Sequence, residues 1–144
     1  MKRKYLKQID RDLVWNRAQF MCEYCLAIFG LYPGVFTIDH IIALAEGGLD
    51  DTSNMALCCN RCNVQKWKFI KALDPLSGKT ISLYNPRKDR WTEHFEWDTD
   101  LATLIGKTPT GRVTITTLQL NQPRVVRYRM LCIGEGHPPT PPNG

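Results

Sequence analysis

The sequence predicts an α+β fold built around a small strand, loop, strand and helix unit that is held at both ends by paired cysteines. Cys22 and Cys25 form one C-x-x-C pair, and Cys59 and Cys62 form a second. The residues between the pairs read as two short strands around a polar loop, and those after the second pair as a helix. Beyond residue 75, short segments alternate apolar and polar residues like half-buried strands. A chain of 144 residues fits one small domain with an extension and excludes a large multidomain protein.

The first half of the chain divides into five predicted segments. Apolar residues at near-helical spacing predict an amphipathic helix over 8–20. A turn-rich stretch then leads into a strand over 35–39, which ends at the pair Asp39-His40. A polar, glycine-containing loop over 45–54 precedes a return strand over 55–59. A helix follows from Asn60, and Asp74-Pro75 stops it.

The second half is less sharply patterned. Strands are expected over 81–86, 91–97 and 103–108, and a basic helix over 123–133. The segment 111–120 stays open, because its β-branched residues favour a strand whereas the preceding Thr108-Pro109 suits a helix start. We therefore expect a cysteine-stapled domain over 1–74, a strand and helix extension over 75–134, and a disordered tail over 135–144.

The cysteine spacing predicts a structural zinc site. The start of the sequence lacks the apolar stretch of a secretory signal, so we expect a cytoplasmic protein whose cysteines are ligands rather than disulfides. Two C-x-x-C pairs supply four thiolates for tetrahedral Zn²⁺. A redox function of either pair is disfavoured, because the βαβ pattern typical of thioredoxin-like motifs is absent. Cys58 and Cys132 are interpreted as ordinary buried residues.

Charge gives a weaker indication of a partner. The chain has 19 Lys and Arg against 14 Asp and Glu, a net charge of +5. Basic residues gather in the first 17 residues and from Arg112 to Arg129, whereas 89–100 is acidic. This pattern is compatible with a polyanionic partner and equally with a solvated charged surface. No segment is long and apolar enough to predict a membrane-spanning helix.

Four polar residues near the second cysteine pair carry the functional prediction: Asp39, His40, Asn54 and Asn63, the last directly after Cys62. The string IDHIIALAEGGLDDTSNMALCCNRCNVQK resembles the core of HNH endonucleases of the ββα-metal (His-Me finger) type. It is most similar to the subgroup in which two C-x-x-C pairs bind a structural zinc. The resemblance covers about residues 15–70.

This resemblance implies a role for each of the four residues. His40 would be the general base, Asn54 would stabilise the surrounding fold, and Asp39 and Asn63 would bind a catalytic divalent metal. Asn63 occupies a position that holds either histidine or asparagine in the family. Because the asparagine ligand is a neutral oxygen, the preferred metal is predicted to be Mg²⁺ or Mn²⁺. The implied reaction is hydrolysis of DNA phosphodiesters to 5′-phosphate and 3′-hydroxyl ends. In a regular strand Asp39 and His40 point to opposite faces, so a shared site requires the strand to end or bulge there.

Other residues are candidates for DNA contact. Lys66 follows Asn63 by one helical turn and is expected either to contact a phosphate or to be a solvated helix lysine. The basic N-terminus and the segment containing Arg112, Arg124 and Arg127 are expected to bind backbone phosphates. Trp91, Phe95 and Trp97 are expected to pack as one strand face, with His94 exposed.

Two other functions remain open on the sequence. A zinc module without activity, which only binds nucleic acid or protein, needs the four cysteines but not the combination of Asp39, His40 and Asn63. A nuclease subunit that acts only within a larger defence, phage or RNA-guided assembly keeps the chemistry and changes the partner. The chain is expected to be a monomer or a homodimer, and a homodimer would suit double-strand cutting.

Overall fold

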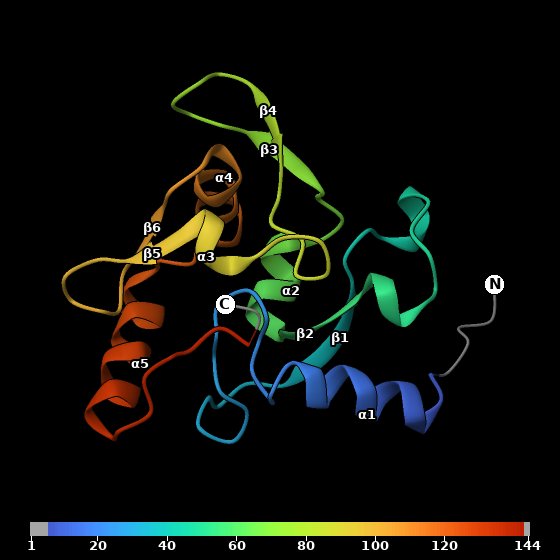
Figure 1. Cartoon of the computed structure of the whole chain (residues 1–144), viewed down its shortest axis with the longest axis horizontal. Coiled ribbons are helices and arrows are strands. Elements are labelled where there is room, and N and C mark those ends of the chain that lie inside the picture. Colours follow the sequence, from blue (N-terminus) through green and yellow to red (C-terminus); the bar gives the residue numbers. More distant parts are fainter. Residues whose placement is uncertain (1–5, 143–144) are drawn as a thin grey trace.

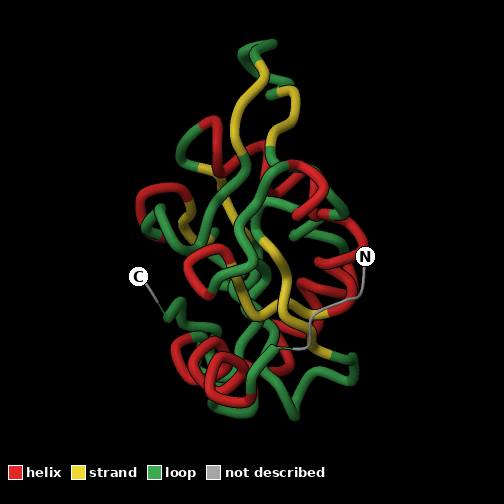
Figure 2. The backbone as a smooth tube through the Cα atoms, turned by 90° about the vertical axis from the view of Figure 1, so that its right-hand side faces the viewer, coloured by secondary structure: helices red, strands yellow, loops and turns green. Residues whose placement is uncertain are grey.

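The computed structural model describes residues 6–142, which fold into a mixture of helices and small antiparallel sheets (Figure 1, Figure 2). Within these residues there are three two-stranded sheets, β1-β2, β3-β4 and β5-β6. In chain order the elements are α1 (Gln8–Arg17), β1 (Phe36–His40), η1 (Leu44–Glu46), η2 (Thr52–Asn54), β2 (Met55–Cys59), α2 (Asn60–Lys66), β3 (Lys71–Leu73), β4 (Thr80–Ser82), α3 (Trp91–His94), β5 (Phe95–Trp97), β6 (Leu104–Gly106), α4 (Pro109–Leu118) and α5 (Pro123–Gly134).

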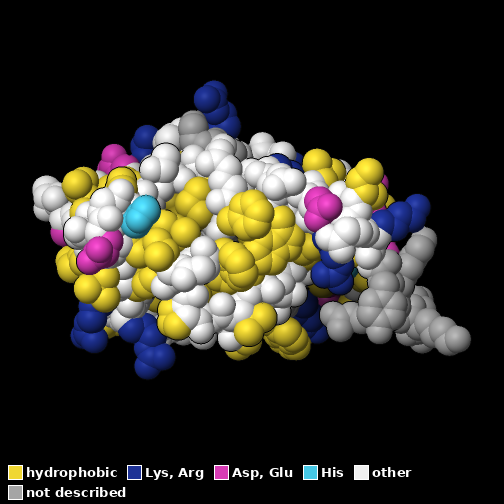
Figure 3. Space-filling view, turned by 90° about the horizontal axis from the view of Figure 1, so that it is seen from below, with side chains coloured by type: hydrophobic (Ala, Val, Ile, Leu, Met, Phe, Trp, Pro, Cys, Tyr) yellow, Lys and Arg dark blue, Asp and Glu magenta, His cyan; other side chains and the backbone are white. Residues whose placement is uncertain are grey.

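The first helix, α1, buries Val14 and ends earlier than the sequence predicts, and Ala18 directly after it is also buried. It stops at Arg17 because Gln19 and Phe20 adopt positive φ angles of 53° and 58°, outside the helical region. The ring of Trp15 packs on aromatic rings of the loop and strand that follow, including Phe29 at a centroid distance of 4.9 Å. The face seen from below in Figure 3, along which α1 runs in Figure 1, carries a broad area of apolar side chains.

The central unit consists of β1, β2 and α2. The two strands pair antiparallel, with Phe36 opposite Cys59 and His40 opposite Met55. All five residues of β2 are buried, as expected for the apolar run MALCC. The helix α2 follows β2 directly and ends at Lys66, because Trp67 has a φ of 47°. The predicted helix from Asn60 is therefore confirmed only over its first seven residues.

The second half forms small elements beside this unit. The open segment 111–120 is largely the helix α4, because Thr108 Oγ1 accepts a hydrogen bond from the Gly111 amide and Pro109 fits the first turn. The strand expected over 91–97 was wrong in its first part, since residues 91–94 form the helical turn α3. Trp91 and Phe95 are buried as predicted, but His94 is half-buried and its Nδ1 lies 2.6 Å from Thr108 Oγ1.

Arginine side chains join the second half to the cysteine-bearing unit. Arg87 pairs with the buried carboxylate of Glu23, which also accepts a hydrogen bond of 2.9 Å from the Leu57 amide. The buried Arg129 donates to the Ala102 carbonyl at 2.9 Å and to the Cys25 carbonyl at 3.4 Å. A single buried cluster runs from α1 through the central unit to α4. The division at residue 74 stays a prediction.

The last helix, α5, ends at Gly134, and residues 135–142 contain neither helix nor strand. Pro139 within this segment is buried. The disorder of the tail stays a prediction, and residues 143 and 144 lie outside the described part. None of the helices in residues 6–142 is long and apolar enough to span a membrane.

The ion pair between Arg112 and Asp74 joins α4 to the residue that follows β3, and its contribution to stability can be tested. Arg112 donates to the fully buried Asp74 through Nε at 3.1 Å and Nη2 at 2.8 Å, and these bonds hold the pKa of Asp74 well below its usual range. Because the folded pKa is depressed, this stabilisation is present at neutral pH and is lost as the pH falls below about 4. We expect Asp74→Asn to lower the melting temperature at pH 7, with a smaller difference from wild type in acid.

Thermal unfolding followed by circular dichroism from pH 7 to pH 3 measures this difference. The exposed Glu96, on β5, provides the control Glu96→Gln, which should leave the melting temperature nearly unchanged. An Asp74→Asn difference that stays constant over the whole pH range would contradict the assignment.

Candidate active site and zinc centre

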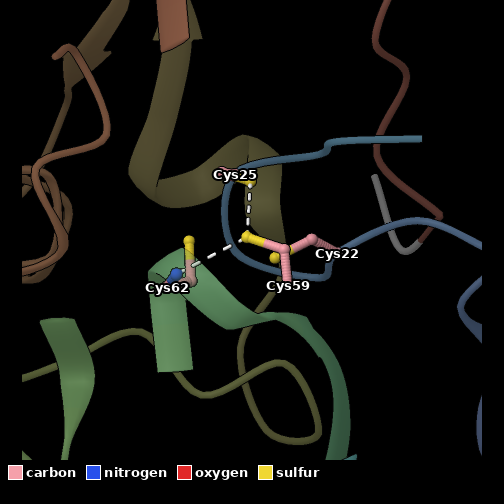
Figure 4. A group of neighbouring side chains, drawn as sticks. All are labelled: Cys22, Cys25, Cys59 and Cys62. Atoms are coloured by element: carbon pink, nitrogen blue, oxygen red, sulfur yellow. Dashed lines mark hydrogen bonds between the residues drawn. The ribbon is translucent and has the colours of Figure 1, made fainter. Parts of the chain in front are cut away.

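The two cysteine pairs come together in one buried cluster (Figure 4). The Sγ atoms of Cys22, Cys25, Cys59 and Cys62 all lie within 4.8 Å of one another. The Cys25 and Cys59 sulfurs are 3.7 Å apart, and four Zn–S bonds of about 2.3 Å arranged as a tetrahedron separate neighbouring sulfurs by roughly 3.8 Å. The predicted four residues therefore form a donor set compatible with structural Zn²⁺.

Hydrogen-bond donors lie close to two of the four sulfurs. The Cys62 amide points at Cys59 Sγ from 3.5 Å, and Arg61 Nη2 lies 3.4 Å from Cys62 Sγ. Such donors around ligating sulfurs orient them and stabilise their negative charge. Burial opposes ionisation of Cys22, but hydrogen bonds from the neighbouring thiols bring its pKa well below the usual value. Hydrogen bonds with Cys22 raise the pKa values of Cys25 and Cys62 well above it, so without a metal one thiolate is shared among the thiols. Cys58 and Cys132 are buried but do not belong to the cluster, as predicted.

His40 is the last residue of β1, and its side chain is 28% exposed. Its Nε2 lies 3.0 Å from Oδ1 of Asp50, a residue of the loop that returns to β2. This contact fixes the orientation of the imidazole ring and places a negative charge beside it. Asp50 was not among the predicted site residues, because its contact with His40 depends on how the loop closes. Its only sequence signal is its position in the polar GGLDD stretch.

Asn54 holds this loop closed and is buried. Its Oδ1 accepts from the Ile42 amide at 2.9 Å, and its Nδ2 donates to the carbonyls of Ile42 and Leu49 at 2.9 and 2.8 Å. Gly48 packs against the backbone that Asn54 binds. A Cβ atom at this position would come within 1.8 Å of the Ile42 carbonyl oxygen. The arrangement suits the scaffold role that the sequence predicts for Asn54, and it positions the chain immediately after His40.

Asp39 lies on the inner side of β1 and is only 7% exposed. Its Oδ2 accepts from the Tyr24 hydroxyl at 3.1 Å and lies 3.1 Å from Lys66 Nζ. Burial raises the pKa of Asp39, while Lys66 and Tyr24 act in the opposite direction. Burial and the neighbouring Asp39 also raise the pKa of Tyr24 well above its usual value.

The structure corrects both predictions for Lys66, that of a phosphate contact and that of a solvated lysine. Its side chain is only 2% exposed. Its Nζ lies 3.1 Å from Asp39 Oδ2, and it donates to the Ile41 carbonyl at 2.8 Å and to the His40 carbonyl at 3.4 Å. An ammonium group has three donors, and these three acceptors account for all of them. Lys66 therefore neutralises Asp39 and fastens α2 to the end of β1.

Asn63 lies in the middle of α2, half-buried and one turn before Lys66. A carboxylate and an amide oxygen are ligands that Mg²⁺ or Mn²⁺ accepts. Because Asp39 Oδ2 already faces Lys66, a divalent ion at this carboxylate would use Oδ1 or displace the ammonium. β1 ends at His40, as a shared site requires, but its pairing shows no bulge between Asp39 and His40.

The predicted phosphate-binding arginines do not lie together at this site. Arg112 is bound to Asp74 through Nε and Nη2, and its contact with DNA stays a prediction. Arg124 and Arg127 are exposed on α5, which lies on the opposite side of the molecule from the loop after β1 (Figure 1). Of the predicted basic N-terminus, Lys2, Arg3 and Lys4 lie outside the described residues. Arg17 is bound to the carbonyls of Thr52 and Met55, both at 2.6 Å.

Comparison with known proteins supports the resemblance to HNH endonucleases. Residues 22–69, one third of the chain, match the family described as HNH endonuclease. The matched segment contains both cysteine pairs and the four predicted site residues. Neither the curated proteins nor the solved structures contain a significant match to the chain.

The cysteine cluster predicts one tightly bound zinc per chain. Structural zinc contributes about 10–16 kcal/mol of binding free energy in small zinc domains, and much of this is folding free energy. We expect Cys62→Ser to lose the bound zinc and most of the secondary structure. Cys58→Ser, next to the cluster but outside it, should retain one zinc per chain. Elemental analysis by mass spectrometry after desalting and circular dichroism measure both properties. Equal zinc loss in the two variants would contradict the ligand assignment.

Proposed function

We propose that this chain is an HNH endonuclease that hydrolyses DNA phosphodiester bonds. The observation that carries the proposal is His40 at the end of β1, partly exposed and oriented by Asp50 within the segment that matches the HNH family. A histidine with a neighbouring carboxylate suits a general base at neutral pH. The resemblance to HNH nucleases implies 5′-phosphate and 3′-hydroxyl products.

In this proposal the imidazole of His40 accepts the proton of the attacking water. Because Nε2 faces Asp50, Nδ1 is the ring nitrogen that receives the proton. The carboxylate of Asp50 stabilises the imidazolium that forms and holds the ring in one orientation, as carboxylates do beside catalytic histidines in other hydrolases. Asn54 acts through the backbone, because its three hydrogen bonds hold residues 42–49 around the ring.

Asp39 and Asn63 are the proposed ligands of a catalytic Mg²⁺ or Mn²⁺. A divalent ion there would stabilise the negative charge of the transition state and of the leaving oxygen. The side-chain amide of Asn63 forms no hydrogen bond with the residues that the structure describes, so its oxygen is available as a metal ligand. The zinc of the cysteine cluster has a different role, because it positions α2 and thereby Asn63.

One observation favours the alternative of a zinc module that binds nucleic acid without cutting it. The carboxylate of Asp39 is already neutralised by the buried ammonium of Lys66. If this ion pair persists when DNA binds, a divalent ion is not held at Asp39, and the domain serves only for recognition. Activity of the isolated chain also separates the proposal from a subunit that cuts only within a larger assembly.

The first functional test is nicking of supercoiled plasmid by the zinc-loaded chain. We expect nicking with added Mg²⁺ or Mn²⁺ and none when both are omitted. His40→Ala should reduce the rate by about 10²–10⁴-fold, the usual contribution of a general base. Omitting the metal is preferable to strong chelation, which also removes structural zinc.

The matched control is His137→Ala, since His137 is exposed beyond α5, outside the candidate site. This variant should cut at the wild-type rate. If the wild-type chain binds plasmid yet does not cut it with either metal, the non-cutting module or the assembly-dependent subunit replaces the proposal.

The second test concerns Asp50. Asp50→Asn keeps a hydrogen-bonding oxygen near His40 but removes the charge, so we expect kcat to fall by up to about 10⁴-fold, as for the same change in serine proteases, with KM little changed. Asp51→Asn is the control, because the neighbouring Asp51 accepts a bond of 2.8 Å from the Ser53 amide and does not contact His40. Steady-state cleavage of a fluorescent duplex gives both constants. Equal losses of kcat in the two variants would indicate a role of this loop in folding only.

A further inference from the structure

We propose that a pocket beside His40 binds an unpaired nucleotide of the DNA substrate, so that the enzyme prefers DNA with a bulged or extruded base. This proposal rests on the proposed function and adds the class of substrate. The pocket has a volume of about 330 Å³ and lies between the chain after β1 and the segments that flank the β3-β4 hairpin. This is the lower end of the size range of small-molecule sites, about 300–1,000 Å³.

The pocket adjoins the candidate active site directly. Ile41 and Ile42, the two residues after His40, form one wall. Lys66, whose ammonium binds the carbonyls of His40 and Ile41, also reaches this wall. A nucleotide held here therefore lies against the two residues that directly follow the proposed general base in the chain.

The lining has the chemistry of a nucleotide site. Phe69, which is 44% exposed, supplies an aromatic ring and Ile70 supplies apolar surface, whereas Tyr84 and Leu83 line the pocket as almost fully buried residues. Lys71 and Lys88 line the pocket and are exposed, and neither takes part in an ion pair formed within residues 6–142. Aromatic surface for a base combined with lysines for adjacent phosphates is the usual composition of single-strand binding sites.

Trp67 extends this aromatic surface beyond the pocket. Its side chain is 62% exposed, and its ring stands edge-on to Phe69 at a centroid distance of 5.7 Å. Lys68 Nζ lies 4.6 Å from the centre of the Trp67 ring. The φ of 47° at Trp67 is unfavourable for a bulky residue. Neither this backbone strain nor the exposure of a large ring helps the chain to fold, whereas both present the ring to a ligand.

The concave shape selects an unpaired nucleotide rather than a paired one. In a duplex the faces of each base are covered by its neighbours, so a base reaches an aromatic pocket only after leaving the stack. Leaving the stack costs least for a base that is already bulged or mismatched. The pocket therefore favours DNA in which one nucleotide next to the cut phosphodiester is unpaired.

Binding is tested without cleavage by using zinc-loaded His40→Ala, which leaves the pocket intact. The probes are two duplexes with the same 2-aminopurine, which is unpaired in a one-nucleotide bulge in the first and paired in the second. Fluorescence anisotropy gives the two Kd values, and 2-aminopurine emission reports stacking. We expect the bulged duplex to bind about tenfold more tightly, with quenching on binding. Phe69→Ala should remove this preference, because stacking of one base contributes about tenfold or more to affinity.

Leu76→Ala is the matched control. Leu76 is an apolar residue with 76% exposure at the tip of the β3-β4 hairpin, outside the pocket. The preference must survive in this variant, and zinc content and circular dichroism must be unchanged in both. Equal affinities for the two duplexes, or equal effects of Phe69→Ala and Leu76→Ala, overturn the proposal.

Comparison with the plasmid assay separates the two proposals. If the chain nicks plasmid but shows no preference for the bulged duplex, the proposed nucleotide pocket is wrong and the proposed nuclease activity is unaffected. A clear binding preference in a wild-type chain that cuts neither plasmid nor the bulged duplex with Mg²⁺ or Mn²⁺ supports the pocket and overturns the proposal that the isolated chain is a nuclease.

Discussion

The four buried sulfurs are the constraint on which the rest of this small structure depends. Cys22 and Cys25 lie before β1, whereas Cys59 ends β2 and caps α2. Closing the cluster joins the two ends of a long intervening segment and removes chain entropy that its small apolar core could not offset alone. The same closure decides where α2 begins. The positions of Asn63 and Lys66 against β1 therefore follow from the cysteine cluster.

The buried pair of Asp39 and Lys66 is the second constraint, and it bears directly on activity. Removing two charges from water is costly, and the cost is offset here because Tyr24 and two backbone carbonyls supply further hydrogen bonds. One turn of α2 separates Lys66 from Asn63, so the helix that carries a proposed metal ligand also brings a cation to Asp39. In the proposed mechanism a divalent ion would have to bind this carboxylate more favourably than the ammonium that is already in place.

Local patterns in the sequence were sufficient to predict the strands, the helix start and the cysteine cluster of the central unit. The cysteine spacing, the strands ending at His40 and Cys59 and the start of α2 all follow from near neighbours in the chain. Contacts between distant residues were not predictable. Lys66 has the sequence context of a surface lysine, and only the position of Asp39 on the neighbouring strand explains its burial. The engagement of Arg112 by Asp74 and of His40 by Asp50 likewise depends on how separate segments meet. The prediction of a strand from residue 91 was wrong, because the alternation of apolar and polar residues is also compatible with one helical turn, α3, before β5.

The end of α2 links the interior of the site to its surface. The reversal of the chain at Trp67 is closed by a hydrogen bond of 2.9 Å from the Phe69 amide to the Lys66 carbonyl. Lys66, the last helical residue, points inward to Asp39, whereas Trp67 projects into solvent and Phe69 reaches the pocket wall. A regular helix continued through residue 69 would lose this division between a buried ion pair and an exposed aromatic surface. The positive φ of Trp67 is therefore the local feature that lets one short helix serve both the anchoring of β1 and the presentation of the aromatic rings.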